Sequence, residues 1–202
     1  MNKPTRIQLE NRAKIAAAAL EVFAAEGFRG ATIDAIAERA GMSKPNLLYY
    51  FASKDAIYRA VLERLLDDWL APLRALNADG DPAVEIAAYL DRKMEMARDY
   101  PQESRLFANE MLRGAPNLSD VIAGELKALV EEKAAVIRGW AAAAKIAPVD
   151  PKHLIFAIWS TTQHYADFDV QVRGLLGDDG EGRFHDGAAF LKRLFLDGLK
   201  PR

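Results

Sequence analysis

Apolar residues recur through this chain with the 3.6-residue period of an α-helix, and this period limits the possible folds more than any other feature. The apolar positions of the first such stretch lie three and four residues apart: Ile15, Ala18, Ala19, Val22 and Phe23. That spacing places them on one face of a helix over about residues 7–26. No segment alternates apolar and polar residues as a half-buried strand does. The sequence therefore predicts an all-α fold.

Capping residues and glycines divide the first fifty residues into three helices. Gly27 is placed to end the first helix, because glycine readily takes the left-handed conformation that follows a helix. Thr32 can cap a second, short helix with its hydroxyl group, and Gly41 ends it. Ser43 is placed to cap a third helix over about residues 44–51.

Proline and glycine breaks indicate further helices along the rest of the chain. We expect one from residue 53 to Pro72 or shortly after, and others over about these residues: 82–99, 101–112, 117–145, 151–174 and 186–199. The glycine-rich, acidic stretch 177–187 lacks the ligand spacing of an EF-hand, so it predicts a flexible connection and no calcium loop. We expect two domains, residues 1–52 and residues 53–202.

The composition excludes several kinds of protein. Half of the residues are hydrophobic and 28% are charged, as in ordinary globular domains. The chain has no cysteine, which excludes disulfides and thiolate metal sites. It shows neither the pattern of a signal peptide nor an apolar run long enough to span a membrane. We therefore expect a cytoplasmic protein without a membrane partner.

The two ends of the chain differ in charge. Residues 1–54 hold eight Lys and Arg against five Asp and Glu, whereas the remainder holds 19 against 24. The formal net charge of the whole chain is only −2. A basic N-terminal region on an acidic remainder is typical of a protein that places one end on nucleic-acid phosphates.

Residues 32–51 have the pattern of a helix-turn-helix, in which the second helix presents its N-terminal side chains to the DNA major groove. Lys44 is placed for a phosphate or a guanine, Asn46 for a base edge or a phosphate, and Tyr49 for a phosphate. The candidate DNA-binding residues are Thr32, Ser43, Lys44, Pro45, Asn46, Tyr49, Tyr50 and Lys54. The alternative is a plain helical hairpin with both tyrosines packed in a core.

The same region resembles a known family. The string AxxxFAAEGFRGATIDAIAERAGMSKPNLLYYFASKDAIY within residues 12–58 is similar to the DNA-binding domain of the TetR family of transcriptional repressors. The resemblance implies a homodimer that binds double-stranded operator DNA. It also implies a larger helical domain for ligand binding and dimerisation.

Three stretches of the remainder are similar to the pyrimidine-utilisation repressors of that family: DxWLAPL (67–73), SRLFANEMLRGAP (104–116) and DPKHLIFAIWSTTQHYADF (150–168). The resemblance implies an effector, uracil or thymine, that releases the operator of pyrimidine-degradation genes, and it implies no cofactor. A regulator of an efflux pump or another pathway, with a different small-molecule effector, is the alternative.

The chemistry of a pyrimidine ring suggests residues to hold it. Trp69 can supply an aromatic face, and Gln163, in an apolar helix, a carboxamide that both accepts and donates. Further candidates to line the site are Lys93, Tyr100, Ser160, Tyr165 and Asp167. Gln163 can instead bond a neighbouring helix, and Trp69 and Trp159 can be core residues.

Three other interpretations concern metal, catalysis and dimerisation. His164 and Asp167 lie on one helix face, but the other two histidines, His153 and His185, are distant in sequence, so we expect no metal site. No catalytic triad, phosphate-binding glycine loop or paired carboxylates indicate an enzyme. We expect a four-helix dimer interface built from Ala157, Ile158, Thr161, Phe190, Leu194 and Phe195.

Overall fold

The computed structural model describes residues 5–177 and 180–201, and its regular elements within these ranges are all helical. This confirms the all-α prediction. The chain divides into two compact units. We call Met1–Asp68 with Arg105–Leu118 the head, and Trp69–Ser104 with Ser119–Arg202 the body. No helix of the described ranges is long and apolar enough to cross a membrane.

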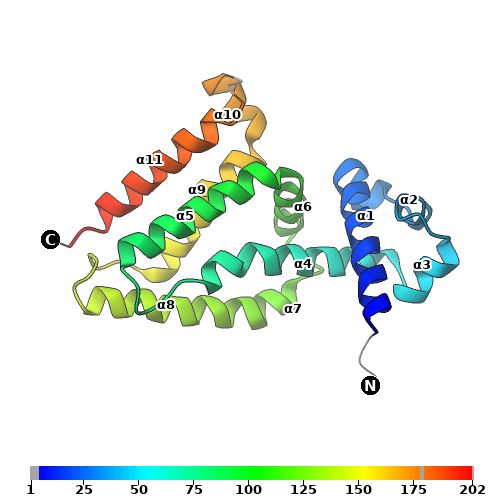
Figure 1. The fold of residues 1–202 in the computed structure, drawn as a ribbon, viewed down its shortest axis with the longest axis horizontal. Helices are drawn as coiled ribbons and strands as arrows, with labels where there is room; N and C mark the ends of the chain where they lie inside the picture. Colours follow the sequence, from blue (N-terminus) through cyan, green and yellow to red (C-terminus); the bar gives the residue numbers. More distant parts are fainter. Residues whose placement is uncertain (1–4, 178–179, 202) are drawn as a thin grey trace. The chain divides into compact units, whose positions relative to one another are not determined.

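The head contains three helices of its own and parts of two that continue into the body (Figure 1). Their bounds are α1 Arg6–Gly30, α2 Ile33–Arg39, α3 Lys44–Tyr50, α4 Lys54–Arg74 and α6 Pro101–Leu112. Helices α4 and α6 each supply residues to both units.

The predicted stop and both predicted caps are confirmed. Gly27 has φ 69° and interrupts the helical backbone within α1, which a residue with a Cβ does only under strain. The Thr32 hydroxyl accepts the backbone N–H of Ala35 at 3.1 Å and starts α2. The Ser43 hydroxyl accepts that of Asn46 at 3.4 Å and starts α3. Each cap satisfies a backbone donor that the helix itself leaves unpaired.

Tyr58 of α4 explains why the head extends beyond residue 52. Its ring lies 4.9 Å from that of Phe23 and 4.7 Å from that of Phe28, between centroids. Burial and the nearby carboxylate of Glu110 raise the pKa of the Tyr58 hydroxyl, and Glu110, a fully buried residue of α6, accepts the backbone N–H of Asn117 at 2.7 Å. The first turns of α4 and the segment after Ser104 are therefore part of the core of the head.

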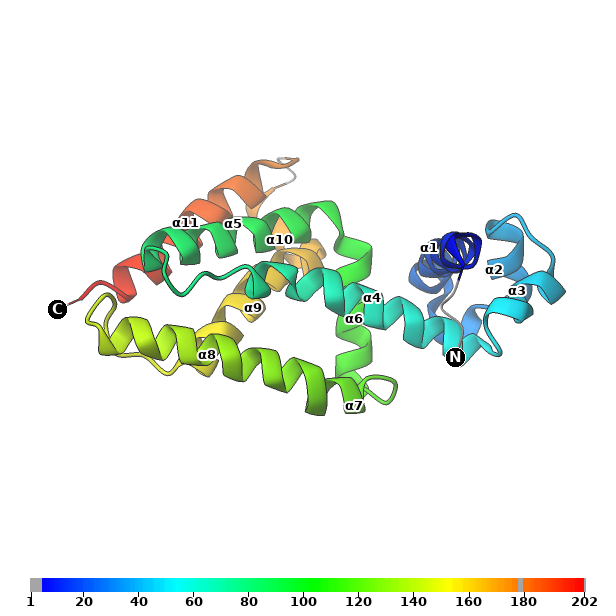
Figure 2. The same ribbon diagram turned by 60° about the horizontal axis from the view of Figure 1, so that its bottom comes forward.

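The body is a packed set of longer helices, with α5 against both α9 and α11 (Figures 1 and 2). Their bounds are α5 Pro82–Asp99, α8 Lys127–Ala142, α9 Pro151–Asp167, α10 Asp169–Leu176 and α11 Gly182–Gly198. A short helix α7, Ser119–Val121, and a π-helical turn, Ile122–Leu126, lead into α8.

The helix boundaries of the body differ from the sequence prediction in two places. The helix expected over 151–174 is broken at Phe168, whose ring instead stacks on His164 with centroids 5.1 Å apart. Helix α11 begins at Gly182 and not at residue 186, and Arg183 in its first turn pairs with Asp169 at 2.9 Å. The expected flexible connection 177–187 is therefore partly helical, and residues 178 and 179 lie outside the described residues.

One further segment also differs. The single helix expected over 117–145 consists of α7, the π-helical turn and α8 in succession. Helix α4, by contrast, ends at Arg74, shortly after Pro72 as expected, since a proline near the end of a helix removes one hydrogen bond without stopping the last residues.

Gly187 is where α11 crowds the side chain of Tyr165. A Cβ at this position meets the Tyr165 ring at 2.6 Å, closer than packed atoms allow. We expect Gly187→Ala to lower the free energy of unfolding by ~1–3 kcal/mol, measured by urea denaturation. Gly198→Ala on the same helix has nothing within 4 Å and is the control, with stability equal to wild type or higher. If both variants are equally stable, the close packing of Gly187 against the Tyr165 ring is contradicted.

Candidate functional site

Helix α3 buries one side and exposes the other. Leu47 has no exposed surface, and Phe51, directly after the helix, is also buried. Lys44, Asn46 and Tyr49 are exposed, Tyr49 by 71%. Leu48 is 38% exposed, so it is only partly packed. A short helix anchored by one apolar side can present its other side chains to a DNA groove.

The candidate residues at the start of α3 have partners within the head. The Lys44 ammonium pairs with the Asp34 carboxylate of α2 at 2.8 Å, with both side chains exposed. Pro45 is exposed in the first turn, as is Ser43 before it. Thr32 is also exposed, at the start of α2.

Tyr50 and Lys54 bind other parts of the head. The Tyr50 hydroxyl accepts a hydrogen bond from the Asn11 side-chain amide at 2.7 Å. The Lys54 ammonium donates to the backbone carbonyls of Phe28 and Ala31 at 2.7 and 2.8 Å. The polar groups of Tyr50 and Lys54 therefore bind within the head. The other five polar candidates are exposed at its surface: Thr32, Ser43, Lys44, Asn46 and Tyr49.

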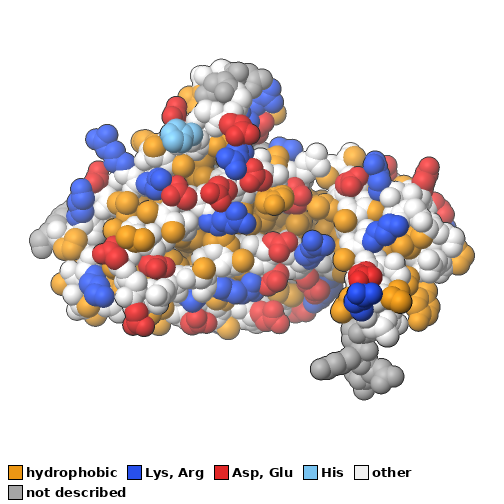
Figure 3. All heavy atoms as spheres, in the orientation of Figure 1, with side chains coloured by type: hydrophobic (Ala, Val, Ile, Leu, Met, Phe, Trp, Pro, Cys, Tyr) orange, Lys and Arg blue, Asp and Glu red, His pale blue; other side chains and the backbone are white. Residues whose placement is uncertain are grey.

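The basic side chains of the head are interspersed with acidic ones. Figure 3 shows this for one face of the head. Arg39, for example, pairs with Glu21 at 3.1 Å. Exposed pairs of this kind contribute little stability. Their basic members can therefore exchange a carboxylate for a phosphate.

In the body, three candidate residues from three helices lie together: Trp69 of α4, Lys93 of α5 and Asp167 of α9. The Lys93 side chain is 2% exposed, and its ammonium lies 5.1 Å from the centroid of the Trp69 ring. The charge of Asp167 acts on Lys93. The indole N–H of Trp69 is buried and has no hydrogen-bond partner among the described residues. A buried donor without an acceptor is costly.

Ser104, at the start of α6, completes what we call the buried polar cluster: the buried Trp69, Lys93 and Ser104 with the half-buried Asp167. Its hydroxyl donates to the Asp167 carboxylate at 2.5 Å, and the residue is buried. Sequence reasoning missed Ser104, because a serine in the first turn of a helix is ordinary there.

Burial lowers the pKa of Lys93 to about 7, because the charged ammonium loses its hydration. The Asp167 carboxylate opposes this shift but only partly offsets it. The amine is therefore close to half-protonated at neutral pH, and small changes around it alter its charge.

The other ligand-site candidates lie in different surroundings. Gln163 is half-buried on α9, one turn before Asp167, and its carboxamide makes no hydrogen bond within the described ranges. Ser160 is exposed and its hydroxyl donates to the carbonyl of Ala157 on its own helix. Tyr165 packs against α11, and Tyr100 is exposed.

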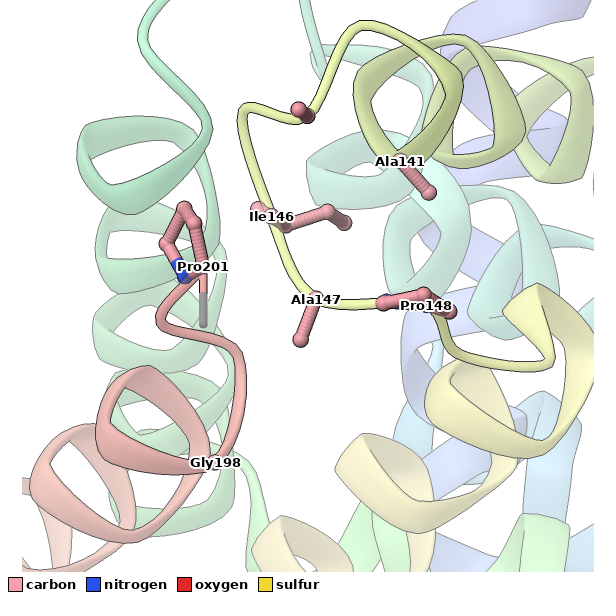
Figure 4. Close-up of a pocket in the computed structure, with 7 residues that line it drawn as sticks. Ala141, Ile146, Ala147, Pro148, Gly198 and Pro201 are labelled. Atoms are coloured by element: carbon pink, nitrogen blue, oxygen red, sulfur yellow. The ribbon is translucent and has the colours of Figure 1, made fainter.

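A pocket of about 390 Å³ lies elsewhere in the body, between the loop after α8 and the end of α11 (Figure 4). It is lined by Ala141, Ala144, Ile146, Ala147, Pro148, Gly198 and Pro201. None of these side chains carries a hydrogen-bonding group. The side chains of this pocket therefore offer no polar group to a ligand, whereas those of the buried polar cluster do.

The outer faces of α9 and α11 expose apolar side chains. Phe156, Phe168, Phe190 and Leu194 are each about half exposed, between 48% and 61%. Ile158, which the sequence places in a dimer interface, is instead buried in the core of the body. The Ile158 side chain faces the core, whereas that of Phe156, two residues earlier, is half exposed.

Comparison with known proteins gives the family. The description "Bacterial regulatory proteins, tetR family" matches residues 15–61, and "YcdC-like protein, C-terminal region", a TetR C-terminal family, matches residues 62–202. The chain belongs to the TetR family. The predicted helix-turn-helix regulator is thereby confirmed, and this protein is a transcriptional regulator.

Relatives and solved structures agree with this assignment. The HTH-type transcriptional regulator RutR of Escherichia coli K12 is 49% identical over 202 residues, covering 99% of this chain and 95% of RutR. The activator FasR of Mycolicibacterium smegmatis is 37% identical over 103 residues, covering 50% and 47%. The fold is similar to that of a putative fatty acid metabolism regulator of Clostridium perfringens (TM-score 0.71, 22% identity, covering 92% and 97%).

The lowered pKa of Lys93 predicts how the stability of the folded protein depends on pH. The unfolded chain keeps the lysine proton up to a pKa of 10.5, whereas the folded protein releases it near 7, so folded stability rises as the pH rises between these values. We expect Lys93→Met to raise the free energy of unfolding by roughly 2–4 kcal/mol at neutral pH and to abolish this slope. Urea denaturation across that range measures both.

Lys133→Met is the matched control. Lys133 is also buried, but its ammonium donates to the Leu76 carbonyl at 3.2 Å and pairs with Glu132 at 3.0 Å. Its removal leaves a carbonyl unpaired, so we expect a loss of stability. If Lys93→Met also loses stability, the burial of the Lys93 ammonium does not cost the protein stability, and the prediction is wrong.

Proposed function

We propose that this TetR-family protein is a repressor of pyrimidine-degradation genes. It binds operator DNA as a homodimer through α3 and is released when uracil or thymine occupies the buried polar cluster. The observation that carries the proposal is the buried indole N–H of Trp69, which has no hydrogen-bond partner among the described residues, beside the almost fully buried Lys93, whose ammonium faces the Trp69 ring.

The DNA-binding half of the proposal is supported by α3. Its exposed side offers a cation, an amide and a phenol at Lys44, Asn46 and Tyr49, groups that bind phosphates and base edges. The caps at Thr32 and Ser43 hold α2 and α3 in place on either side of the Gly41 turn.

The effector half is supported by complementary chemistry. A uracil ring is flat and carries two carbonyl acceptors and two N–H donors along its edge. The carbonyl oxygens suit the Trp69 N–H and the Lys93 ammonium, and the Gln163 carboxamide, one turn along α9, can accept a ring N–H. A ligand that satisfies buried donors recovers the free energy that their burial costs. The similarity of residues 67–73, 104–116 and 150–168 to pyrimidine-utilisation repressors supports the same ligand.

The dimer is supported by the exposed apolar side chains of α9 and α11, of which Phe156, Phe190 and Leu194 are examples. When two helices of one copy bury their exposed apolar faces against the same two helices of a second copy, they form a four-helix interface. Two copies joined in this way carry two α3 helices for two operator half-sites.

Coupling between effector and DNA is supported by the continuity of two helices. Helix α4 contributes Tyr58 to the head and Trp69 to the body, and α6 contributes Glu110 to the head and Ser104 to the body. A ligand that binds one arrangement of Trp69 and Ser104 better than another shifts the population of both helices. The shift changes the spacing of the two α3 helices and releases the operator.

The first test is a gel-shift titration with the operator, whose sequence a footprint defines. We expect uracil or thymine to dissociate the complex, and tryptophan fluorescence to report the same ligand through Trp69. Lipophilic cations should have no effect. Release by such cations with indifference to uracil and thymine would instead favour the regulator of an efflux pump.

The second test is Lys44→Ala, which removes a cation from the exposed side of α3. We expect about tenfold weaker operator binding and a shallower salt dependence, since one fewer phosphate counterion is displaced. Lys200→Ala removes an exposed cation from the body and should change neither. A salt slope for Lys44→Ala equal to that of wild type means that Lys44 contacts no phosphate.

A further inference from the structure

Among the described residues the body buries two lysines, Lys93 and Lys133, and only Lys133 has hydrogen-bond or ion-pair acceptors there. Lys133 donates to the Leu76 carbonyl and pairs with Glu132. For Lys93, the interactions within the described ranges are the face of the Trp69 ring and the charge of Asp167. Both side chains are almost fully buried, at 7% and 2% exposure. Lys93 is therefore a buried cation that the protein itself does not fully satisfy.

The neighbours of Lys93 leave its charge state finely balanced. Helix α9 supplies one charge, the Asp167 carboxylate, which is itself bonded by Ser104 of α6. Helix α4 supplies the uncharged Trp69. The titratable group one turn back on α5 is Tyr89, whose burial raises its pKa, so it is neutral.

Helix α11, which packs against α5, carries one lysine, Lys192, and this lysine pairs with Asp91 of α5 at 2.8 Å. The pKa of Lys93 at about 7 follows from burial, with Asp167 as the one opposing charge. Any acceptor that reaches the amine therefore favours the ammonium form.

We propose that effector binding is coupled to the uptake of a proton by Lys93, and that this selects neutral or anionic ligands with a carbonyl oxygen over organic cations. The inference rests on the proposed effector site. The proton comes from solvent and adds to the neutral amine, and the resulting ammonium donates a hydrogen bond to the carbonyl oxygen of the ligand. No covalent bond to the ligand forms or breaks.

The sign of the pH dependence follows from this. Above a pH of about 7 the amine of the free protein is largely neutral, whereas the bound lysine keeps its proton to a higher pH. Ligand binding therefore takes up protons in this range, and affinity falls as the pH rises, by at most about tenfold per pH unit.

Calorimetry of uracil binding to the whole dimer tests the proposal. Titrations at about pH 8, one unit above the pKa of Lys93, are run in two buffers that differ in ionisation enthalpy. We expect the apparent binding enthalpy to differ between the buffers in the sense of proton uptake. Lys133→Met should keep this difference, since Lys133 already has its acceptors.

Two variants at the site separate charge from packing. Lys93→Arg keeps a donor that stays protonated throughout this range, so uracil should bind with the same enthalpy in both buffers. Lys93→Met removes the donor, and should bind at least tenfold more weakly without proton uptake.

The outcomes distinguish this inference from the proposed function. Uracil binding by the wild type with equal enthalpies in the two buffers overturns the inference alone, as does a buffer difference that persists in Lys93→Arg. The absence of binding by uracil and thymine, with operator binding intact, overturns the effector assignment and the inference together. Tight binding of an organic cation at this site also overturns the inference.

Discussion

The burial of Lys93 against Trp69 is the interaction on which the interpretation of the body depends. A lysine in an apolar core costs stability unless something compensates for its lost hydration, and here the one nearby charge, Asp167, only partly does so. The indole N–H beside it is equally unsatisfied. Donors buried in this way lower the stability of the fold, and a ligand that supplies acceptors can restore it. Such an arrangement is typical of a binding site.

In the head, by contrast, two polar side chains that are buried or half-buried have hydrogen-bond partners. Glu110 is fully buried but accepts from the backbone and side-chain amides of Asn117, and Lys54 donates to two backbone carbonyls. Leu47 and Phe51 anchor α3 in the core of the head, with its polar side outward. A helix anchored in this way on a scaffold can present its polar side to the DNA groove.

Local sequence signals gave most helix boundaries, because caps and breakers act within a few residues. The bounds of α5 and α6 agree with the prediction, since Asp81, Pro82 and Pro101 mark the starts directly. The break at Phe168 and the early start of α11 were not predictable. They depend on a ring stacked on His164 and on the Asp169–Arg183 pair, and neither contact has a local pattern.

The sequence by itself determined the helix-turn-helix, its caps and its exposed residues, because each depends on neighbours within one or two turns. It also suggested Trp69, Lys93 and Asp167 without showing that they meet. Only the tertiary structure decided that these three lie with Ser104 in one cluster, and that Tyr100 and Ser160 are exposed elsewhere. Residues on α4, α5, α6 and α9 come together through helix packing, so their shared site arises only when the core of the body forms.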